Sequence, residues 1–254
     1  MLNRLALWAR LRAGGIHLLI SASAAALAAG LVFGLWYPGF YRFVSGGQNL
    51  FLLVTNVDVV LGPLLTFAVF NPKKGRKQLR RDLSAIAAIQ SAALIYGLHT
   101  VYIVRPIAMA FEVDRFRVIV AADVYEPELP EARPEYRTLP LTGPWLIGTR
   151  APNAGDEHND AVFMGLQGID RANRPMFWQP YALSVNDVRA KSRPIDVLLM
   201  HYPERAAGFR ACLSKMNASE SNARFLPLRA RGDWIVVVDA GGSVLGYLQA
   251  DGFF

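Results

Sequence analysis

Cysteine is nearly absent from this chain: Cys212 is the only one among 254 residues. One cysteine forms no internal disulfide, and it cannot build the paired-cysteine sites that hold structural zinc. Cys212 shares a helical pattern with Phe209 and Met216 that places apolar residues on one face. We therefore expect a small core residue at this position rather than a nucleophile.

The sequence signatures of common enzymes are also missing. The chain contains no GxSxG, HExxH, CxxC, GxxxxGK[ST] or GxGxxG pattern. His158 and His201 are isolated along the chain, so surface or hydrogen-bonded positions are the simpler interpretation for both. From these absences we expect a protein that is not an enzyme and has no catalytic, cofactor-binding or metal-binding residues.

Charge is missing from three long apolar runs in the first half of the chain. No Asp, Glu, Lys or Arg occurs within Gly14–Tyr41 or Leu83–Val104, and Leu50–Phe70 carries only Asp58. A helix of roughly 20 apolar residues crosses the hydrocarbon core of a membrane. The pattern therefore predicts a membrane protein with transmembrane helices at about residues 16–36, 50–70 and 83–104.

The pattern changes after Arg105, where short apolar stretches alternate with Pro, Gly and charged residues. We expect a membrane domain at residues 1–105, followed by an α+β domain at 106–254. Two strands or one bent strand are predicted at 107–121 and a β-hairpin at 234–249, whereas 126–144 is predicted to be an exposed connection. Helices are predicted at 156–169, 185–191, 194–200 and 205–216.

The net charge of +7 is unevenly distributed. Residues 1–104 contain ten Lys or Arg and two Asp, whereas residues 105–254 contain 17 basic and 18 acidic residues, which gives +8 and −1. The excess of positive charge thus belongs to the membrane half. Because nucleic-acid binding needs a basic surface on the folded module, we expect no nucleic acid among the partners.

The densest positive charge lies in NPKKGRKQLRRD at residues 71–82, between the second and third apolar runs. Arg4, Arg10 and Arg12 precede the first run. Short loops rich in Lys and Arg stay in the cytoplasm. The N-terminus and the 71–82 loop are therefore predicted to be cytoplasmic, with the second half of the chain outside. Binding of anionic lipid headgroups is a secondary expectation for this loop.

Polar and small residues within the runs are candidate partner contacts. An ionisable residue in a span is costly and usually faces a partner or a polar cavity. At 100° per residue, one face of the second run carries Thr55, Asp58, Gly62 and Thr66. This face contacts either another membrane helix or the same bundle, and in the second case Gln90, Ser91 and His99 are the expected partners of Asp58.

Two further groups are candidate contact surfaces. Gly30 and Gly34 continue a ridge of small residues that starts at Ala22 and Ala26, and such a ridge allows another helix to approach closely. The sequence leaves open whether that helix is internal or belongs to a partner. In the second half, an aromatic group that docks a partner or packs in the core comprises Trp145, Trp178 and Tyr181.

Five segments of the first half form an ordered series: GIHLLIS (15–21), LWYPGFY (35–41), DVVLGPLLTFAVFNPKK (58–74), RRDLSAIAAIQSAALIYGLHTVYIVRP (80–106) and FEVDRFRVIVAADV (111–124). In order and spacing they resemble the TfpX/TfpZ-type type IV pilin accessory proteins. The resemblance covers about half of the chain, and the remainder fits only as a variable outer domain.

The resemblance implies a location in the bacterial inner membrane with a periplasmic outer domain. It implies a non-enzymatic accessory protein or chaperone that binds a cognate type IV major pilin and controls its stability and assembly. It implies no catalytic residues. The alternatives are a membrane-anchored enzyme of the cell envelope and a small-molecule sensor, and the sequence identifies neither the pilin nor the oligomeric state.

The charge distribution generates a test of topology. A reporter fused after Lys77 is expected to behave as cytoplasmic, and one fused after Arg150 as periplasmic, because cations hold the 71–82 loop inside. Paired alkaline phosphatase and fluorescent protein fusions measure this. Periplasmic activity at Lys77 would contradict the arrangement of three spans.

Overall fold

The computed structural model describes residues 4–254. It divides into two compact units, Met1–Arg105 and Pro106–Phe254, which are treated separately below. Three long apolar helices make up most of the first unit, and helices around a mixed sheet make up the second. This confirms the predicted fold class of three N-terminal apolar helices followed by an α+β domain.

The first unit is helical throughout. Its elements are α1 (Arg4–Leu31), which continues as the π-helix η1 (Val32–Trp36), then α2 (Tyr41–Val44), α3 (Gly47–Val69) and α4 (Arg76–Ile103). The segments Ala6–Trp36, Gly47–Val69 and Arg76–Ile103 are long and apolar enough to cross a membrane. Both α1 and α4 begin earlier than the predicted spans, because the Arg, Lys, Gln and Leu residues before the apolar runs favour helix.

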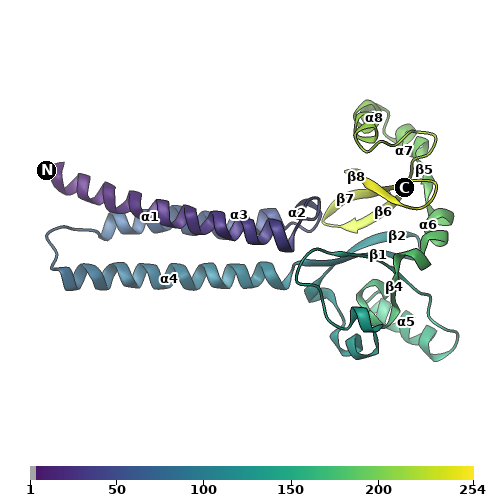
Figure 1. The fold of residues 1–254 in the computed structure, drawn as a ribbon, viewed down its shortest axis with the longest axis horizontal. Coiled ribbons are helices and arrows are strands. Elements are labelled where there is room, and N and C mark those ends of the chain that lie inside the picture. The colour runs from purple at the N-terminus through teal and green to yellow at the C-terminus, as the bar shows by residue number, and fades with distance from the viewer. Residues whose placement is uncertain (1–3) are drawn as a thin grey trace. The chain divides into compact units, whose positions relative to one another are not determined.

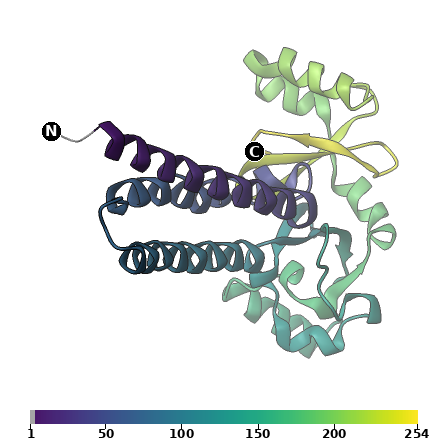
Figure 2. The same cartoon turned by 60° about the vertical axis from the view of Figure 1, so that its left-hand side comes forward.

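The helix α3 contacts both α1 and α4 (Figures 1 and 2). Glycines allow the close approach on either side. A Cβ at Gly14 would lie 3.3 Å from the carbonyl oxygen of Pro63, and one at Gly97 would lie 2.1 Å from Cγ1 of Val54. At the other end of α1, the buried Tyr37 hydroxyl donates a hydrogen bond to the carbonyl of Val101 at 2.8 Å.

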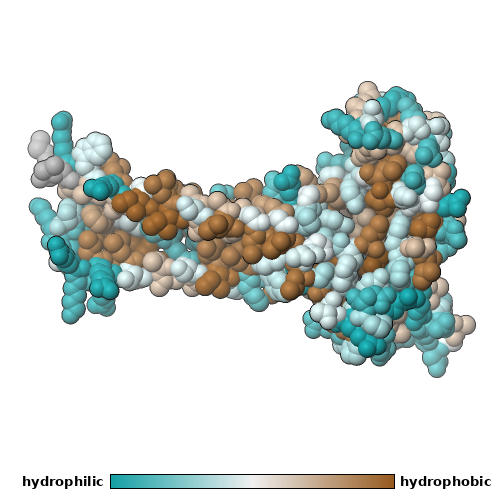
Figure 3. All heavy atoms as spheres, in the orientation of Figure 1, coloured by the Kyte–Doolittle hydropathy of each residue, from teal (hydrophilic) through white to brown (hydrophobic). Residues whose placement is uncertain are grey.

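Large apolar side chains cover the outside of this bundle, as the brown surface along the helices shows (Figure 3). Leu19, Leu27 and Ile89 are 70%, 78% and 70% exposed. Exposed apolar surface of this extent is unfavourable in water and marks contact with lipid or protein. The hydrophilic surface gathers at the end of the bundle where the loop between α3 and α4 lies.

The second unit contains an eight-stranded mixed sheet in the order β4-β3-β1-β2-β6-β7-β8, with β5 paired to β6. The strands are β1 (Pro106–Glu112), β2 (Arg115–Val120), β3 (Trp145–Thr149), β4 (Trp178–Pro180), β5 (Arg193–Pro194), β6 (Arg224–Ala230), β7 (Gly232–Val238) and β8 (Val244–Leu248). Pairing is parallel between β1 and β3 and between β2 and β6, and antiparallel elsewhere.

Four α-helices and several short 3-10 turns connect these strands. The α-helices are α5 (Asp156–Leu166), α6 (Val185–Lys191), α7 (Ile195–His201) and α8 (Ala206–Lys215). The 3-10 turns are η2 (Ala121–Asp123), η3 (Glu126–Glu131), η4 (Pro134–Tyr136), η5 (Arg171–Asn173), η6 (Pro175–Phe177), η7 (Tyr181–Leu183) and η8 (Pro203–Arg205). The predicted helices and the C-terminal hairpin are confirmed, and of the two alternatives for 107–121 the structure has two strands rather than one bent strand.

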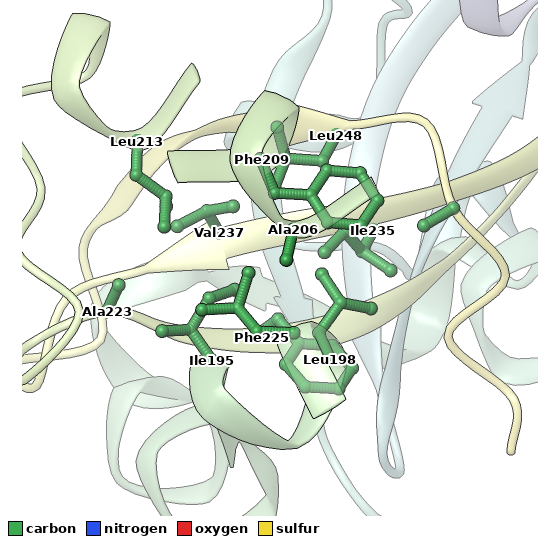
Figure 4. Packing of buried hydrophobic residues seen from close by; sticks show 12 residues of the cluster. Ile195, Leu198, Ala206, Phe209, Leu213, Ala223, Phe225, Ile235, Val237 and Leu248 are labelled. Carbon is green, nitrogen blue, oxygen red and sulfur yellow. The ribbon is translucent and has the colours of Figure 1, made fainter. Parts of the chain in front are cut away.

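Apolar clusters pack on both halves of the sheet, and two of them are described here. The first cluster packs around β1 and β3 and includes Ile107, Ile147 and Trp178. The second lies where α7 and α8 cover β6 and β7, with Phe225 and Ile235 near its centre and Cys212 packed against it (Figure 4). Between the halves, β2 and β6 pair at only two positions, Phe116 with Leu228 and Arg117 with Arg229.

Two expectations for this unit need correction. The connection at 126–144 is not uniformly exposed: Glu128, Ala132 and Tyr136 are buried. The turns η3 and η4 fold it onto the sheet, and Arg174 forms an ion pair with Glu128 at 2.5 Å. The strands β3, β4, β5 and β6 were not predicted: β4 and β5 are only three and two residues long, and Pro interrupts the pattern of β6.

The close approach of α3 and α4 generates a stability test. Gly97→Ala is expected to destabilise the bundle by about 1–3 kcal/mol, since the new methyl group overlaps the stiff Val54 side chain. Gly30→Ala is the matched control, because a Cβ at Gly30 meets nothing within 4 Å. Thermal unfolding in detergent measures both, and equal unfolding temperatures would contradict the packing described.

Candidate functional site

Three residues of the predicted α3 face lie inside the bundle. Thr55 and Thr66 are 6% and 3% exposed. The Thr66 hydroxyl lies 2.5 Å from Nδ1 of His17, and that of Thr55 donates to the carbonyl of Phe51 at 2.9 Å. A Cβ at Gly62 would lie 2.0 Å from Nε2 of a glutamine side chain on α4. These three residues therefore contribute to internal helix packing.

Asp58, the fourth residue of that face, is half-buried. Gln90, one of its three expected partners, donates a hydrogen bond at 3.1 Å, but the acceptor is the backbone carbonyl of Asp58. Within residues 4–254, no hydrogen bond or ion pair engages the Asp58 carboxylate. The carboxylate is thus available to a group outside the bundle.

The ridge of small residues runs along α1 into η1, where Gly34 lies, and it faces away from the other helices. Ala22, Ala26, Gly30 and Gly34 are all exposed, and a Cβ at either glycine would meet nothing within 4 Å. The opposite side of α1 is the one that packs internally, through residues such as Ala28 and Val32. Among the described residues, the ridge therefore has no helix packed on it.

The side chains of the predicted aromatic group mainly pack within the second unit. Trp178 is 1% exposed and donates its indole N–H to the carbonyl of Ala172 at 2.8 Å. The ring of Trp145 lies 6.4 Å from that of Trp178 at the edge of the same cluster. The Tyr181 hydroxyl donates to the carbonyl of Gly242 at 2.5 Å. Burial removes Trp178 from any docking surface.

A network of four charged residues lies where β2 meets β6. Arg117 and Arg229 occupy paired positions, and Asp170 forms ion pairs with both of them. Arg117 also lies 3.6 Å from the carboxylate of Glu112, which accepts a hydrogen bond from the backbone N–H of Ala172 at 3.0 Å. The two acids thus compensate two like charges that the strand register brings together.

Burial raises the pKa of Glu112, although the Ala172 N–H and Arg117 oppose this shift. The sequence did not single out this network, because its members come from β1, β2, β6 and the segment after α5. The only signal was the placement of Glu112 and Arg117 within apolar strand patterns, and that signal does not identify their partners.

The two isolated histidines lie in different environments: His158 lines a cleft together with Glu112 and Asp170, and His201 packs on an aromatic ring. His158 is exposed, and the His201 ring stacks on that of Phe254 with centroids 3.7 Å apart. Across the part of the chain that the structure describes, no three His, Cys, Asp or Glu residues lie together as metal ligands.

A family model described as "Fimbrial assembly protein FimB" matches residues 5–46. Three curated relatives come from Dichelobacter nodosus. "Fimbrial assembly protein, serogroup I" is 36% identical and "Fimbrial assembly protein, serogroup E1" is 34% identical, each over 242 residues that make up 94% of both chains. "Fimbrial assembly protein, serogroups C1 and C2" is 46% identical over 118 residues, 46% of this chain and 90% of that one. No solved structure matches the chain.

The raised pKa of Glu112 generates a prediction of pH dependence. A raised folded-state pKa means that Glu112 contributes stability below its ordinary value of 4.5 and loses that contribution as pH rises through the raised value. Glu112→Gln removes this titration. The stability difference between the variant and the unmodified protein is therefore expected to shift in favour of the variant as the pH rises from about 4 to about 7. Denaturant unfolding in detergent at each pH measures this difference.

Glu220→Gln is the control for this experiment, because Glu220 forms an exposed ion pair with Arg210. Its effect is expected to stay within about 1 kcal/mol at either pH. If the difference between Glu112→Gln and the unmodified protein does not change with pH, burial of the Glu112 charge is not the dominant effect.

Proposed function

This chain belongs to the fimbrial assembly protein family, and on that premise we propose that it is a non-enzymatic accessory protein of pilus assembly. The observation that carries the proposal is the extent of the similarity, which covers 94% of this chain and so includes both units. The function therefore depends on the apolar helices together with the outer domain.

The finer proposal is that the chain binds a cognate type IV major pilin and modulates its stability and entry into the pilus. The resemblance of residues 15–124 to TfpX/TfpZ-type accessory proteins supports it. Before assembly, such a pilin has one apolar N-terminal helix in the membrane and a globular head outside. Two weak contacts, one from each unit of this chain, would gain affinity through effective concentration.

The exposed ridge on α1 supports a contact with the pilin helix. Without a hydrophobic driving force inside the bilayer, helices associate where small residues allow their backbones to pack closely. Ala22, Ala26, Gly30 and Gly34 provide such a surface, and no described part of this chain covers it. The Asp58 carboxylate is a second candidate contact in the same unit.

The proposed location is the bacterial inner membrane, with the N-terminus in the cytoplasm and residues 106–254 in the periplasm. Cations in the first twelve residues and in the 71–82 loop support this orientation. The same cations are available to anionic lipid headgroups, which we include among the proposed partners.

The alternative of a cell-envelope enzyme is less well supported by the polar residues of the outer domain. Glu112 is buried and Asp170 is partly exposed, and arginines engage both carboxylates. A general base needs a carboxylate that can reach a substrate proton. The family and this geometry together favour a binding role.

The proposed helix contact is tested by filling the ridge. The double substitution Gly30→Leu and Gly34→Leu is expected to reduce co-purification of the pilin in mild detergent by about tenfold, because bulk on the ridge separates the helices. Ala88→Leu with Ala92→Leu is the matched control, since both alanines are exposed and lie four residues apart on α4. This control is expected to leave co-purification unchanged.

Equal pilin recovery from both double variants would exclude the ridge as the contact. Failure of the unmodified protein to recover pilin, and to change pilin levels in cells, would overturn the proposed function itself.

A further inference from the structure

A cleft of about 570 Å³ opens on the second unit beside the four-residue charge network. The turn between β1 and β2 and the first two turns of α5 form its walls, and Asp170, Arg171 and Arg229 complete it. Its volume falls within the range of about 300–1,000 Å³ that is usual for ligand sites. The cleft is therefore large enough to hold several side chains of a partner.

One wall of the cleft is apolar and extends beyond it along α5. Val113 and Val162 line the cleft and are 56% and 52% exposed. The next residues along α5 that are large and apolar, Phe163 and Leu166, are 62% and 83% exposed. No residue of α5 is buried. A helix with three exposed large apolar residues and no buried one presents an unfilled contact face.

Ion pairs hold α5 in place instead of apolar packing. Arg150 donates two hydrogen bonds to the carboxylate of Glu157, at 3.0 and 2.6 Å, and Arg174 pairs with Asp160 at 2.6 Å. The bonds from Arg150 lower the pKa of Glu157 to about 2, so this pair stays charged at neutral pH. The apolar side chains of α5 are therefore not needed to anchor the helix.

The polar part of the cleft carries a surplus of positive charge. Three arginines line it, Arg115, Arg171 and Arg229, against the two carboxylates of Glu112 and Asp170. Both carboxylates already pair with Arg117 behind them. Arg229 has a side chain that is 57% exposed and lies 3.5 Å from Asp170, which leaves most of its donors directed elsewhere.

We propose that this cleft binds a segment of the pilin head in which a carboxylate lies next to apolar side chains. The inference rests on the proposed function, and it assigns that function a site in the outer domain. The carboxylate is complementary to Arg171 and Arg229, which can bind it in bidentate geometry. The neighbouring apolar side chains pack on Val162 and Leu166.

A protein segment fits these observations better than a small molecule or a membrane surface. A small molecule in the cleft would leave Phe163 and Leu166 in water, because they lie outside the cleft lining. Arginines compensate Glu157 and Asp160 on α5, which leaves Asp156 as the acid of this helix that would oppose an anionic membrane surface. A protein can cover the apolar residues and supply the carboxylate together.

Photo-crosslinking in cells that make both proteins tests the site. A benzophenone amino acid replaces Leu166 in the full chain, and the same group replaces Met200 on α7, which is 70% exposed, as the control. A third variant carries it at Leu27, beside the α1 ridge and 78% exposed. We expect a covalent adduct with the pilin head from position 166, identified by mass spectrometry, and none from position 200.

The charge requirement is tested in the same cells. Arg171→Gln with Arg229→Gln is expected to lower the adduct yield from position 166 by about tenfold, because both proposed carboxylate ligands are lost. Arg210→Gln is the matched control, since Arg210 is a similarly exposed arginine paired with an acid on a different surface. It is expected to leave the yield unchanged.

Each contrary result has a distinct meaning. Pilin adducts from position 27 but not from position 166 would overturn the cleft and leave the proposed function standing. Adducts of position 166 with lipid alone, or equal pilin yields from positions 166 and 200, would also overturn it. Loss of pilin adducts from positions 27 and 166 together, with no pilin recovered by co-purification, would overturn the proposed function as well.

Discussion

The ion pairs of Asp170 connect β2 and β6, the strands at which the two halves of the sheet in the second unit meet. The β2 and β6 strands share only two register positions, and at one of them Arg117 faces Arg229. Like charges at paired positions repel, so this parallel contact depends on the acidic residue that bonds to both. Glu112 supplies further negative charge from the end of β1. The network thus compensates the positive charge at this two-residue contact, next to the buried pair of Phe116 and Leu228.

The same charge network forms part of the lining of the cleft on the second unit, through Glu112, Asp170 and Arg229. Glu112 ends β1 and Asp170 follows α5, so their attachment to Arg117 fixes the β1–β2 turn next to the helix. The helix itself is anchored through charged residues, which frees its apolar residues for contact with another molecule. In this arrangement a structural charge network and a candidate binding surface share residues, and the binding surface uses the arginines that the network leaves partly exposed.

The membrane unit separates internal packing from external contact in a comparable way. Gly14, Gly62 and Gly97 allow α3 to approach its neighbours closely, so these positions are packed inside the bundle. The small residues of the exposed ridge make no such contact with the described helices. Small residues thus have two roles in one unit, and only their position around each helix distinguishes them. Together with the cleft, the ridge gives each unit one surface for the proposed pilin.

Much of the fold was determined by sequence alone. Three long runs with at most one charged residue, Asp58, specify apolar helices because an uncompensated charge is costly in hydrocarbon. The C-terminal strands and their glycine turn specify the β7–β8 hairpin, and the alternation at 107–121 indicates strand structure there. The ends of α1 and α4 were not predicted, since helix propensity continued beyond the apolar runs. These features are local, so a short stretch of sequence contains their cause.

Only the tertiary structure decided which candidate residues face a partner. Gly62 and Thr66 are four residues apart, as are Gly30 and Gly34, yet the first pair is buried inside the bundle and the second is exposed. Trp178 is in the core, whereas Leu166, which no pattern singled out, is the most exposed large apolar residue of α5. Asp170 meets two arginines from distant strands. Burial and pairing depend on contacts between segments far apart along the chain, and one sequence does not specify the rotation and register that create them.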